Sequence, residues 1–412
     1  MALPDDLSRL LGKFPMRTLR LLGGLADGQL GLGGVGARRT MIVKTQAVGQ
    51  RHVVFDMDVV SDPSKQALGP DAAGMLKTAA AAGQYAAMAA LPPRLETHAL
   101  NVLTDLGDHA LRSLRLDWFA DCGDSDLCSL HLAEQLQRIG AGTVLQRVRG
   151  EDFRTAVWTF RDLRAGCVGC AMTRGQRDAA HRIHSCTNAD REPPERAAAA
   201  LAATQAAAAA HAVQEQWLLA HDPSARPANY VLRLNAETGG CRIIEIQRSP
   251  DCRHHPEPIP WQQVRLLSGA TTRTLRPIDL MNETGSQSLS FDRPLVQLAA
   301  CQRCDARYQL DPPTSLAVLL AAGAGCPSCG GDLRALLAGR RVSRESASAR
   351  RTLLEIGMPL GHVYRLSQPE AWLAIDDAAE LFAPDATPPK RTWSLQPLAH
   401  ADATAAWMAG DA

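Results

Sequence analysis

The sequence predicts an α/β fold with a mixed sheet, followed by a small Cys-rich ribbon and a short α/β tail. Three observations lead to this prediction. Over residues 1–130, apolar runs typical of strands alternate with helix-like segments, an order that favours a parallel sheet. Further strand-like runs then follow one another directly, as antiparallel strands do. Two Cys-x-x-Cys pairs lie close together between residues 301 and 329.

Apolar patterning and turn residues predict the individual elements. Strands are expected at 52–60, 95–103 and 114–126, with a helix at 72–91 that ends before Pro92 and Pro93. Strands at 142–150 and 155–163, an Ala-rich helix at 194–221, and a hairpin of strands at 229–235 and 240–249 follow. Residues 301–333 are expected to be loop-like, 340–351 to be a basic, Ser-rich linker, and 353–385 to form the α/β tail.

Composition excludes several classes of protein. The 412 residues include 44 basic and 43 acidic side chains, a balance that argues against a dedicated nucleic-acid binder. The first 22 residues carry two acidic side chains and no long apolar run, so they resemble neither a signal peptide nor a membrane anchor. The Ala-rich helix is too weakly apolar to span a bilayer. We therefore expect a cytoplasmic protein with neither a nucleic-acid nor a membrane partner.

Cysteine spacing predicts two zinc sites. Cys167 and Cys170 form a Cys-x-x-Cys pair, and Cys252 with His255 supplies a second pair later in the chain, with His254 as the alternative ligand. The competing interpretation is a buried, apolar Cys252 beside two surface histidines. With four protein ligands and no open position, this site would be structural.

The second site has the spacing of a zinc ribbon. Its candidate ligands are Cys301, Cys304, Cys326 and Cys329. Two unlinked pairs, or a redox-active second pair, are the alternatives. A ribbon this small has little core, so zinc would supply much of its folding free energy, and its expected role is protein recognition.

A glycine-rich stretch at 31–36 is a candidate phosphate-binding loop of a nucleotide site. Glycines let a backbone approach phosphates closely, although a flexible turn explains the stretch alone equally well. Side chains downstream support a phosphate site: they are Asp56, Asp58, Lys65, Gln66, Lys77 and Asp124. Ligands of open parallel sheets bind at the carboxyl ends of the strands, so we expect these groups to converge on a nucleoside triphosphate with Mg²⁺.

The ordered set Gly-x-Gly-Gly-x-Gly, Asp-x-Asp, basic-Gln, Lys and Asp-Cys-x-Asp resembles the ThiF/MoeB/HesA family, the prokaryotic relatives of ubiquitin-activating enzymes. The similarity continues through the first Cys-x-x-Cys pair, a lone Cys186, the Ala-rich helix and the second ligand pair, over roughly residues 30–256. It implies a Rossmann-like domain that uses ATP and Mg²⁺ to adenylylate the C-terminal glycine carboxylate of a small β-grasp protein.

The resemblance also implies residue roles. Gly31, Gly33, Gly34 and Gly36 would form the phosphate loop, with a ribose contact from Asp58 at the end of the Asp56–Asp58 motif. Lys65, beside Gln66, and Lys77 would face the phosphates, and Asp124 would hold Mg²⁺.

Cys186 is the candidate nucleophile. His181, Arg182 and His184 precede it, and cations lower the pKa of a thiol. In the resembling family a cysteine at this point forms a thioester or acyl disulfide with the activated protein. The alternative is a surface thiol with no chemical role.

Two other functions compete with adenylylation. The segment before the glycines, "LADGQL", replaces the family's apolar strand, Ser125 stands where Asn is usual, and only Arg17 and Arg20 offer a match to the family's N-terminal arginine. These departures favour a non-catalytic scaffold that presents a peptide to a partner enzyme. An NAD-dependent oxidoreductase is a poorer alternative, because it explains neither Asp124 nor the zinc ligands.

The expected organisation is an adenylation domain at 1–300, a zinc ribbon at 301–340 and an extension at 341–412. The expected partners are a ubiquitin-like or sulfur-carrier protein, a conjugating-type acceptor protein, and a second copy of the chain in a homodimer.

Overall fold

The computed structural model describes residues 29–33, 51–56, 70–88, 94–122, 126–151, 154–180, 202–235, 238–321, 325–383 and 391–398. The chain divides into two compact units. The first contains Met1–Leu100, Arg115–Thr173 and Pro194–Glu257, and the second contains Asn101–Leu114, Arg174–Pro193 and Pro258–Ala412. No helix in these described ranges is both long and apolar enough to cross a membrane.

The first unit is built on the mixed sheet that the sequence predicts. Its strand order is β3-β2-β1-β4-β5-β6-β7-β8. The five strands from β3 to β5 are parallel, and β6, β7 and β8 continue the sheet in antiparallel fashion. The strands are β1 (Gln29–Gly33), β2 (Arg51–Phe55), β3 (Arg94–His98), β4 (Trp118–Asp121), β5 (Val144–Glu151), β6 (Arg154–Phe160), β7 (Asn229–Asn235) and β8 (Gly240–Glu245).

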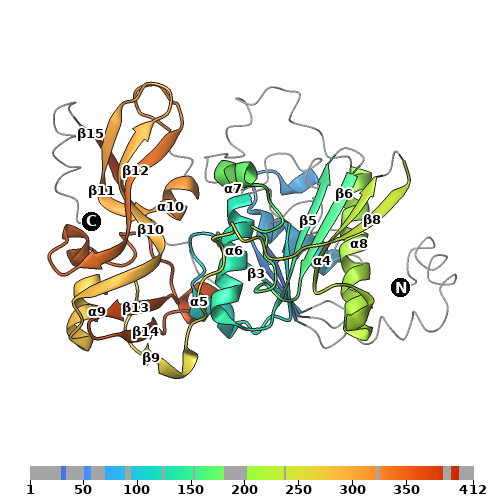
Figure 1. Ribbon diagram of the computed structural model, residues 1–412, viewed down its shortest axis with the longest axis horizontal. Coiled ribbons are helices and arrows are strands. Elements are labelled where there is room, and N and C mark those ends of the chain that lie inside the picture. The colour runs from blue at the N-terminus through green and yellow to red at the C-terminus, as the bar shows by residue number, and fades with distance from the viewer. Residues whose placement is uncertain are drawn as a thin grey trace. The chain divides into compact units, whose positions relative to one another are not determined.

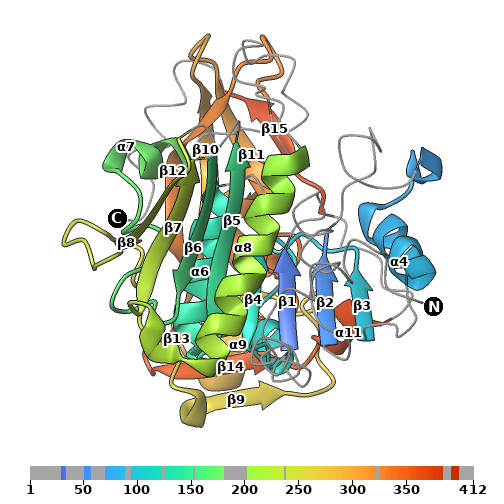
Figure 2. The same ribbon diagram turned by 90° about the vertical axis from the view of Figure 1, so that its right-hand side faces the viewer.

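Two long helices cover opposite faces of this sheet, α6 (Asp126–Ile139) and α8 (Ala202–His221) (Figures 1 and 2). Ala208, Ala209 and Ala212 of α8 are fully buried, and they pack in one cluster with Val148 and Tyr230 of the sheet. Because alanine lacks a long side chain, the helix can approach the strands closely, which explains how an Ala-rich segment serves as core. The other helical segments of this unit are η1 (Pro70–Ala72), α4 (Lys77–Met88) and η3 (Pro223–Ala225).

The second unit contains a separate sheet of order β15-β11-β10-β13-β14-β9, in which β12 also pairs with β10. Its strands are β9 (Val264–Leu267), β10 (Ser288–Cys301), β11 (Arg307–Ser315), β12 (Leu333–Ser343), β13 (Val363–Ser367), β14 (Ala371–Ile375) and β15 (Ser394–Pro397). Its helical segments are α5 (Asp108–Ser113), α7 (Arg174–Ala180), η4 (Trp261–Gln263), α9 (Pro277–Thr284), α10 (Leu316–Ala321), η5 (Ala347–Arg350) and α11 (Ala379–Phe382).

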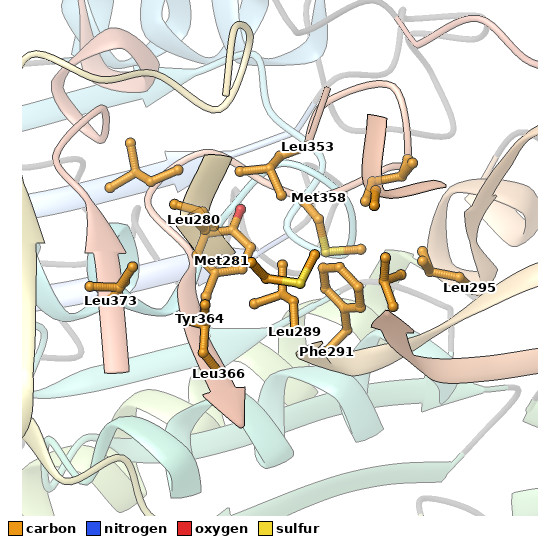
Figure 3. Packing of buried hydrophobic residues seen from close by; sticks show 14 residues of the cluster. Leu280, Met281, Leu289, Phe291, Leu295, Leu353, Met358, Tyr364, Leu366 and Leu373 are labelled. Carbon is orange, nitrogen blue, oxygen red and sulfur yellow. The ribbon is translucent and has the colours of Figure 1, made fainter. Parts of the chain in front are cut away.

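An apolar cluster forms the core of the second unit. Figure 3 shows Leu280 and Met281 of α9 packing against side chains of β10, β13 and β14. Tyr364 and Phe291 meet edge to face, with ring centroids 6.5 Å apart. Such aromatic contacts stabilise a core beyond the area that they bury.

Two expectations for the C-terminal part of the chain were wrong. The segment expected to be loop-like, 301–333, contains β11 and α10, even though Pro312 and Pro313 lie within β11. The expected linker, 340–351, continues β12 and then forms η5. Val342 and Ala349 are buried in the apolar cluster of Figure 3, which explains why this Arg- and Ser-rich segment is ordered. Residue 300, the expected domain boundary, lies inside β10.

Candidate functional site

The strand order of the first unit has a switch point between β1 and β4. The chain passes from β1 to β2 and β3 on one side of β1, and then to β4 on the other side. In open parallel sheets, ligands bind beyond the carboxyl ends of the strands at such a point. The switch point therefore marks the candidate nucleotide site of this unit.

One row of residues crosses the sheet at these carboxyl ends. Gly33 is paired with Phe55 on one side and with Asp121 on the other. The row continues outward to His98 of β3 and Arg147 of β5. A glycine therefore stands at the centre of the row, between an aromatic residue and an acidic residue.

Gly31 and Gly33 lie within strand β1, where the sequence predicted a phosphate loop. The rings of Phe55 and Phe119, on the two strands that flank β1, are parallel and 6.1 Å apart between centroids. The absence of side chains at Gly31 and Gly33 allows these rings to approach across β1. These two glycines therefore have a packing role. Gly34 and Gly36 lie outside the described residues.

Acidic residues follow the row directly. Asp56, which comes after β2, is buried, and its N–H donates to the His98 carbonyl at 3.2 Å. Lys77 is the first residue of α4 and is half-buried. The remaining predicted nucleotide ligands, Asp58, Lys65, Gln66 and Asp124, lie outside the described residues, as do Cys186, Arg17 and Arg20.

Asp121 was not among the predicted site residues. It ends β4, is only 2% exposed, and accepts a hydrogen bond from Ser129 on α6. Arg149 of β5 lies 4.0 Å from the same carboxylate oxygen and balances its charge. The sequence could have indicated Asp121, because it is the first Asp of the Asp-Cys-x-Asp motif. Through the hydrogen bond from Ser129, Asp121 connects the end of β4 to α6, shortly before Asp124 in the chain.

Cys128, near this carboxylate, does not serve as a thiolate. Burial, reinforced by the charge of Asp121, raises the pKa of Cys128 to about 12. The thiol therefore stays protonated at neutral pH and packs as a small apolar group.

The first predicted metal cluster forms in the first unit. Cys167, Cys170, Cys252 and His255 place one ligand atom each within 4.8 Å of one another. The Cys167 sulfur lies 3.8 Å from that of Cys170, 3.7 Å from that of Cys252 and 3.5 Å from His255 Nε2. Ligands at zinc–sulfur and zinc–nitrogen bond lengths span a tetrahedron with edges of about 3.6–3.8 Å. The geometry fits zinc, with His255 in the ligand position.

Residues around the cluster select His255 over His254. His255 Nδ1 lies 3.0 Å from Gln137 Oε1 on α6, which leaves Nε2 to face the sulfurs. His254 Nδ1 instead lies 2.6 Å from Glu134 Oε1, away from the cluster. An oxygen that accepts from the second ring nitrogen fixes the tautomer of a metal-binding histidine. Gln137 is therefore the orienting residue for His255.

Gly169 allows the two halves of the cluster to meet. A Cβ at this position would lie 2.8 Å from His254 Cδ2 and 2.9 Å from the Cys252 sulfur. Both distances are shorter than real contacts, so the Cys167–Cys170 turn needs glycine here. The backbone N–H of Ser249 also donates to the Cys170 sulfur at 3.3 Å. The hydrogen bond between Cys167 and Cys170 lowers the pKa of Cys170 and raises the pKa of Cys167, so the proton of this pair stays on Cys167.

The second predicted cluster forms where β10, β11 and β12 meet. Its members are Cys301, Cys304, Cys326 and Cys329. The sulfurs of Cys301 and Cys329 are 3.4 Å apart, and those of Cys304 and Cys326 are 3.6 Å apart. Cys301 is the last residue of β10, Cys304 lies between β10 and β11, and the second pair lies before β12. The donor set and spacing fit tetrahedral zinc, with all four positions filled by protein.

Hydrogen bonds to sulfur support this second cluster. The backbone N–H groups of Arg303 and Cys304 donate to the Cys301 sulfur at 3.2 and 3.4 Å. Tyr308 Oη lies 3.0 Å from the Cys326 sulfur. Burial opposes ionisation of Cys326, but hydrogen bonds from Tyr308 and from backbone amides outweigh it and lower its pKa to about 6. These donors stabilise thiolates, as metal binding requires.

The chain was compared with known proteins. No family model matches it. No curated protein matches it either. Among solved structures, it is similar to Escherichia coli MccB with ATP, at 13% identity, TM-score 0.43, over 57% of this chain and 68% of MccB. MccB with MccA-N7isoASN is similar at 14% identity, with the same TM-score and coverage. PaaA is similar at 13% identity, TM-score 0.40, over 56% of this chain and 67% of PaaA. Because each TM-score is below 0.5, we draw no conclusion about function from these neighbours.

Proposed function

We propose that the first unit binds ATP·Mg²⁺ and adenylylates the C-terminal carboxylate of a small protein or peptide. One observation carries the proposal: the row of Phe55, Gly33 and Asp121 at the carboxyl ends of β2, β1 and β4, at the switch point of the sheet. The rest of the glycine-rich stretch follows Gly33 immediately in the chain, and glycines let a backbone approach phosphates closely.

The reaction assigns a role to each candidate residue. A carboxylate oxygen of the substrate attacks the α-phosphorus of ATP, the bond to the bridging oxygen breaks, and pyrophosphate leaves. Lys65 and Lys77 would neutralise the phosphates, and Asp58 would accept from the ribose hydroxyls. Asp124 would hold Mg²⁺, which offsets charge on the leaving pyrophosphate when it is bound. Asp121 would position the segment with Asp124 through its contact with Ser129.

The substrate class is part of the proposal. A small β-grasp protein of the ubiquitin-like or sulfur-carrier type, ending in glycine, has the flexible carboxyl terminus that the reaction needs. The acyl adenylate would then pass to Cys186 as a thioester with release of AMP, and from there to an acceptor protein. The enzyme would act as a homodimer. Neither zinc cluster takes part in the chemistry, because each has four protein ligands and no open position.

ATP–pyrophosphate exchange tests this function. The full chain, loaded with zinc, is incubated with ATP, Mg²⁺, labelled pyrophosphate and a panel of glycine-ending β-grasp proteins and peptides. We expect at least one carrier to support exchange, and Asp124→Ala to abolish it without unfolding the protein. The matched control is Asp117→Ala, an exposed aspartate that directly precedes β4, which should keep full exchange.

The same experiment separates the two candidate functions. A carrier that binds the chain but supports no exchange would favour the non-catalytic scaffold. Loss of exchange in both aspartate variants would instead indicate damage to β4, and would not support a metal-binding role for Asp124.

A further inference from the structure

Strand β12 in the second unit has one open edge. This strand of 11 residues pairs with β10, and no other strand in the described ranges pairs with it (Figure 1). The N–H and C=O groups along such an edge can pair with another extended chain. The edge is therefore a candidate docking surface.

The side chains of this edge strand form a distinct pattern. Arg334, Leu336, Ala338 and Arg340 occupy every second position of β12, and all four are exposed. Leu336 is 41% exposed, which makes it one of the few large apolar side chains at the surface. The exposed side chains of β12 thus include a small apolar centre with a cation toward each end of the strand.

The cations are not neutralised within the second unit. Arg334 lies 4.0 Å from Asp305, but both side chains are more than half exposed, so this pair is weak. Arg340 makes no ion pair with any described residue. From residue 333 to residue 344 the sequence contains four arginines and no acidic residue.

The positive charge of β12 indicates which kind of partner can pair with its open edge. Two copies of β12 paired antiparallel about Leu337 would place Arg334 opposite Arg340 of the other copy, at both ends. Like charges directly opposite one another destabilise a strand pair. Nucleic acid also fits poorly, because β12 carries no aromatic side chain on which a base can stack. An extended peptide with acidic residues at both ends and apolar residues between them matches the charges and the apolar centre.

We propose that the open edge of β12 binds an acidic, extended segment of a partner protein by strand addition. The backbone of the partner would pair with the outer edge of β12, and its carboxylates would meet Arg334 and Arg340. This surface is independent of the proposed adenylylation chemistry.

A competing explanation is that the edge is protective. Arginine side chains and irregular pairing discourage edge strands from aggregating, and the register between β10 and β12 shifts at three points. A protective edge would bind no peptide, so a binding experiment distinguishes the two explanations.

The probe is a fluorescein-labelled peptide, capped at both ends, of sequence Glu-Thr-Val-Thr-Val-Thr-Glu. Its glutamates match the spacing of Arg334 and Arg340. Fluorescence anisotropy with the full-length, zinc-loaded chain should show saturable binding that weakens with added salt. A peptide with lysine in place of glutamate, and one with N-methylated alternate amides, should each bind at least about ten-fold more weakly, because one loses the charge pairs and the other the backbone pairing.

Charge reversal at the edge tests the surface itself. The variant R334E/R340E should lose about ten-fold in affinity for the glutamate peptide and gain affinity for the lysine peptide. The matched control, R350E, changes another exposed arginine of the second unit and should bind like the wild type. Equal binding of the glutamate and lysine peptides, unchanged affinity in R334E/R340E, or tighter binding of a labelled single-stranded RNA 12-mer would overturn the proposal.

Discussion

Replacing Gln137 by Met should loosen one of the two zinc ions and leave the other unchanged. Gln137 is buried, and its Oε1 lies 3.0 Å from His255 Nδ1. Methionine has a similar length but no oxygen to accept from the ring N–H. Without that acceptor, the imidazole of His255 can rotate or change tautomer, and its Nε2 no longer faces the three sulfurs.

The expected loss of zinc affinity can be estimated, because His255 loses the hydrogen-bond acceptor that orients it. Such losses typically lower metal affinity by about 10- to 100-fold. This corresponds to roughly 1.4–2.7 kcal/mol. The ligands themselves are kept, so zinc should still bind at the first cluster at high concentration. The second cluster shares no residue with Gln137 and should keep its affinity.

Competition with a chelator of graded concentration, read by a zinc indicator, measures both ions in the full chain. For each zinc ion, the measurement gives the chelator concentration at which half of the ion is released. In Gln137→Met this concentration should be lower than in the wild type for one ion and unchanged for the other. Tyr308→Phe provides the reciprocal control, because Tyr308 supports Cys326 in the second cluster. If Gln137→Met releases both ions like the wild type, then Gln137 does not orient His255 and the first cluster has been assigned incorrectly.

Three further predictions follow from the structure. Elemental analysis should find two zinc ions per wild-type chain and one in Cys301→Ser, with the first unit still folded; fewer than about 1.5 ions in the wild type would contradict the two-cluster assignment. His362→Phe should lower the free energy of unfolding by about 3 kcal/mol, since His362 lies 3.3 Å from Asp108 and 3.0 Å from Asp292, and both carboxylates would lose a buried partner. His109→Phe, which alters a more exposed histidine–aspartate pair, should cost less than about 1 kcal/mol in the same urea titration, and equal costs would refute the argument. Cys186→Ser should keep pyrophosphate exchange but lose a thiol-sensitive adduct on a non-reducing gel, and downstream transfer equal to the wild type would show that Cys186 is a surface thiol.

Local patterns in the sequence predicted several elements correctly. Strands β7 and β8 pair as the predicted hairpin, with Asn235 opposite Gly240, and β5 and β6 are antiparallel as expected. The residues of both predicted metal clusters do come together, because ligand spacing within a tight turn is a local property. His255, and not His254, lies with the three cysteines of the first cluster, and zinc binding there stays a prediction.

Long-range partners explain what the sequence did not predict. Residues 95–103 were expected to form one strand, but β3 ends at His98, and the chain from Asn101 onward belongs to the second unit. Leu103 accepts a hydrogen bond from Arg293, nearly 200 residues later. Strand β12 was not predicted, because it carries three arginines, only one of its edges is paired and few of its side chains are buried. Such partners leave no periodic signal in the local sequence.

Equilibrium dialysis with labelled ATP and Mg²⁺ tests whether the chain has a nucleotide site. We predict saturable binding of one ATP per chain, which needs Mg²⁺, is lost in Asp124→Ala, and is not displaced by NAD. No saturable binding of ATP by a folded, zinc-loaded chain, or tighter binding of NAD than of ATP, would contradict it.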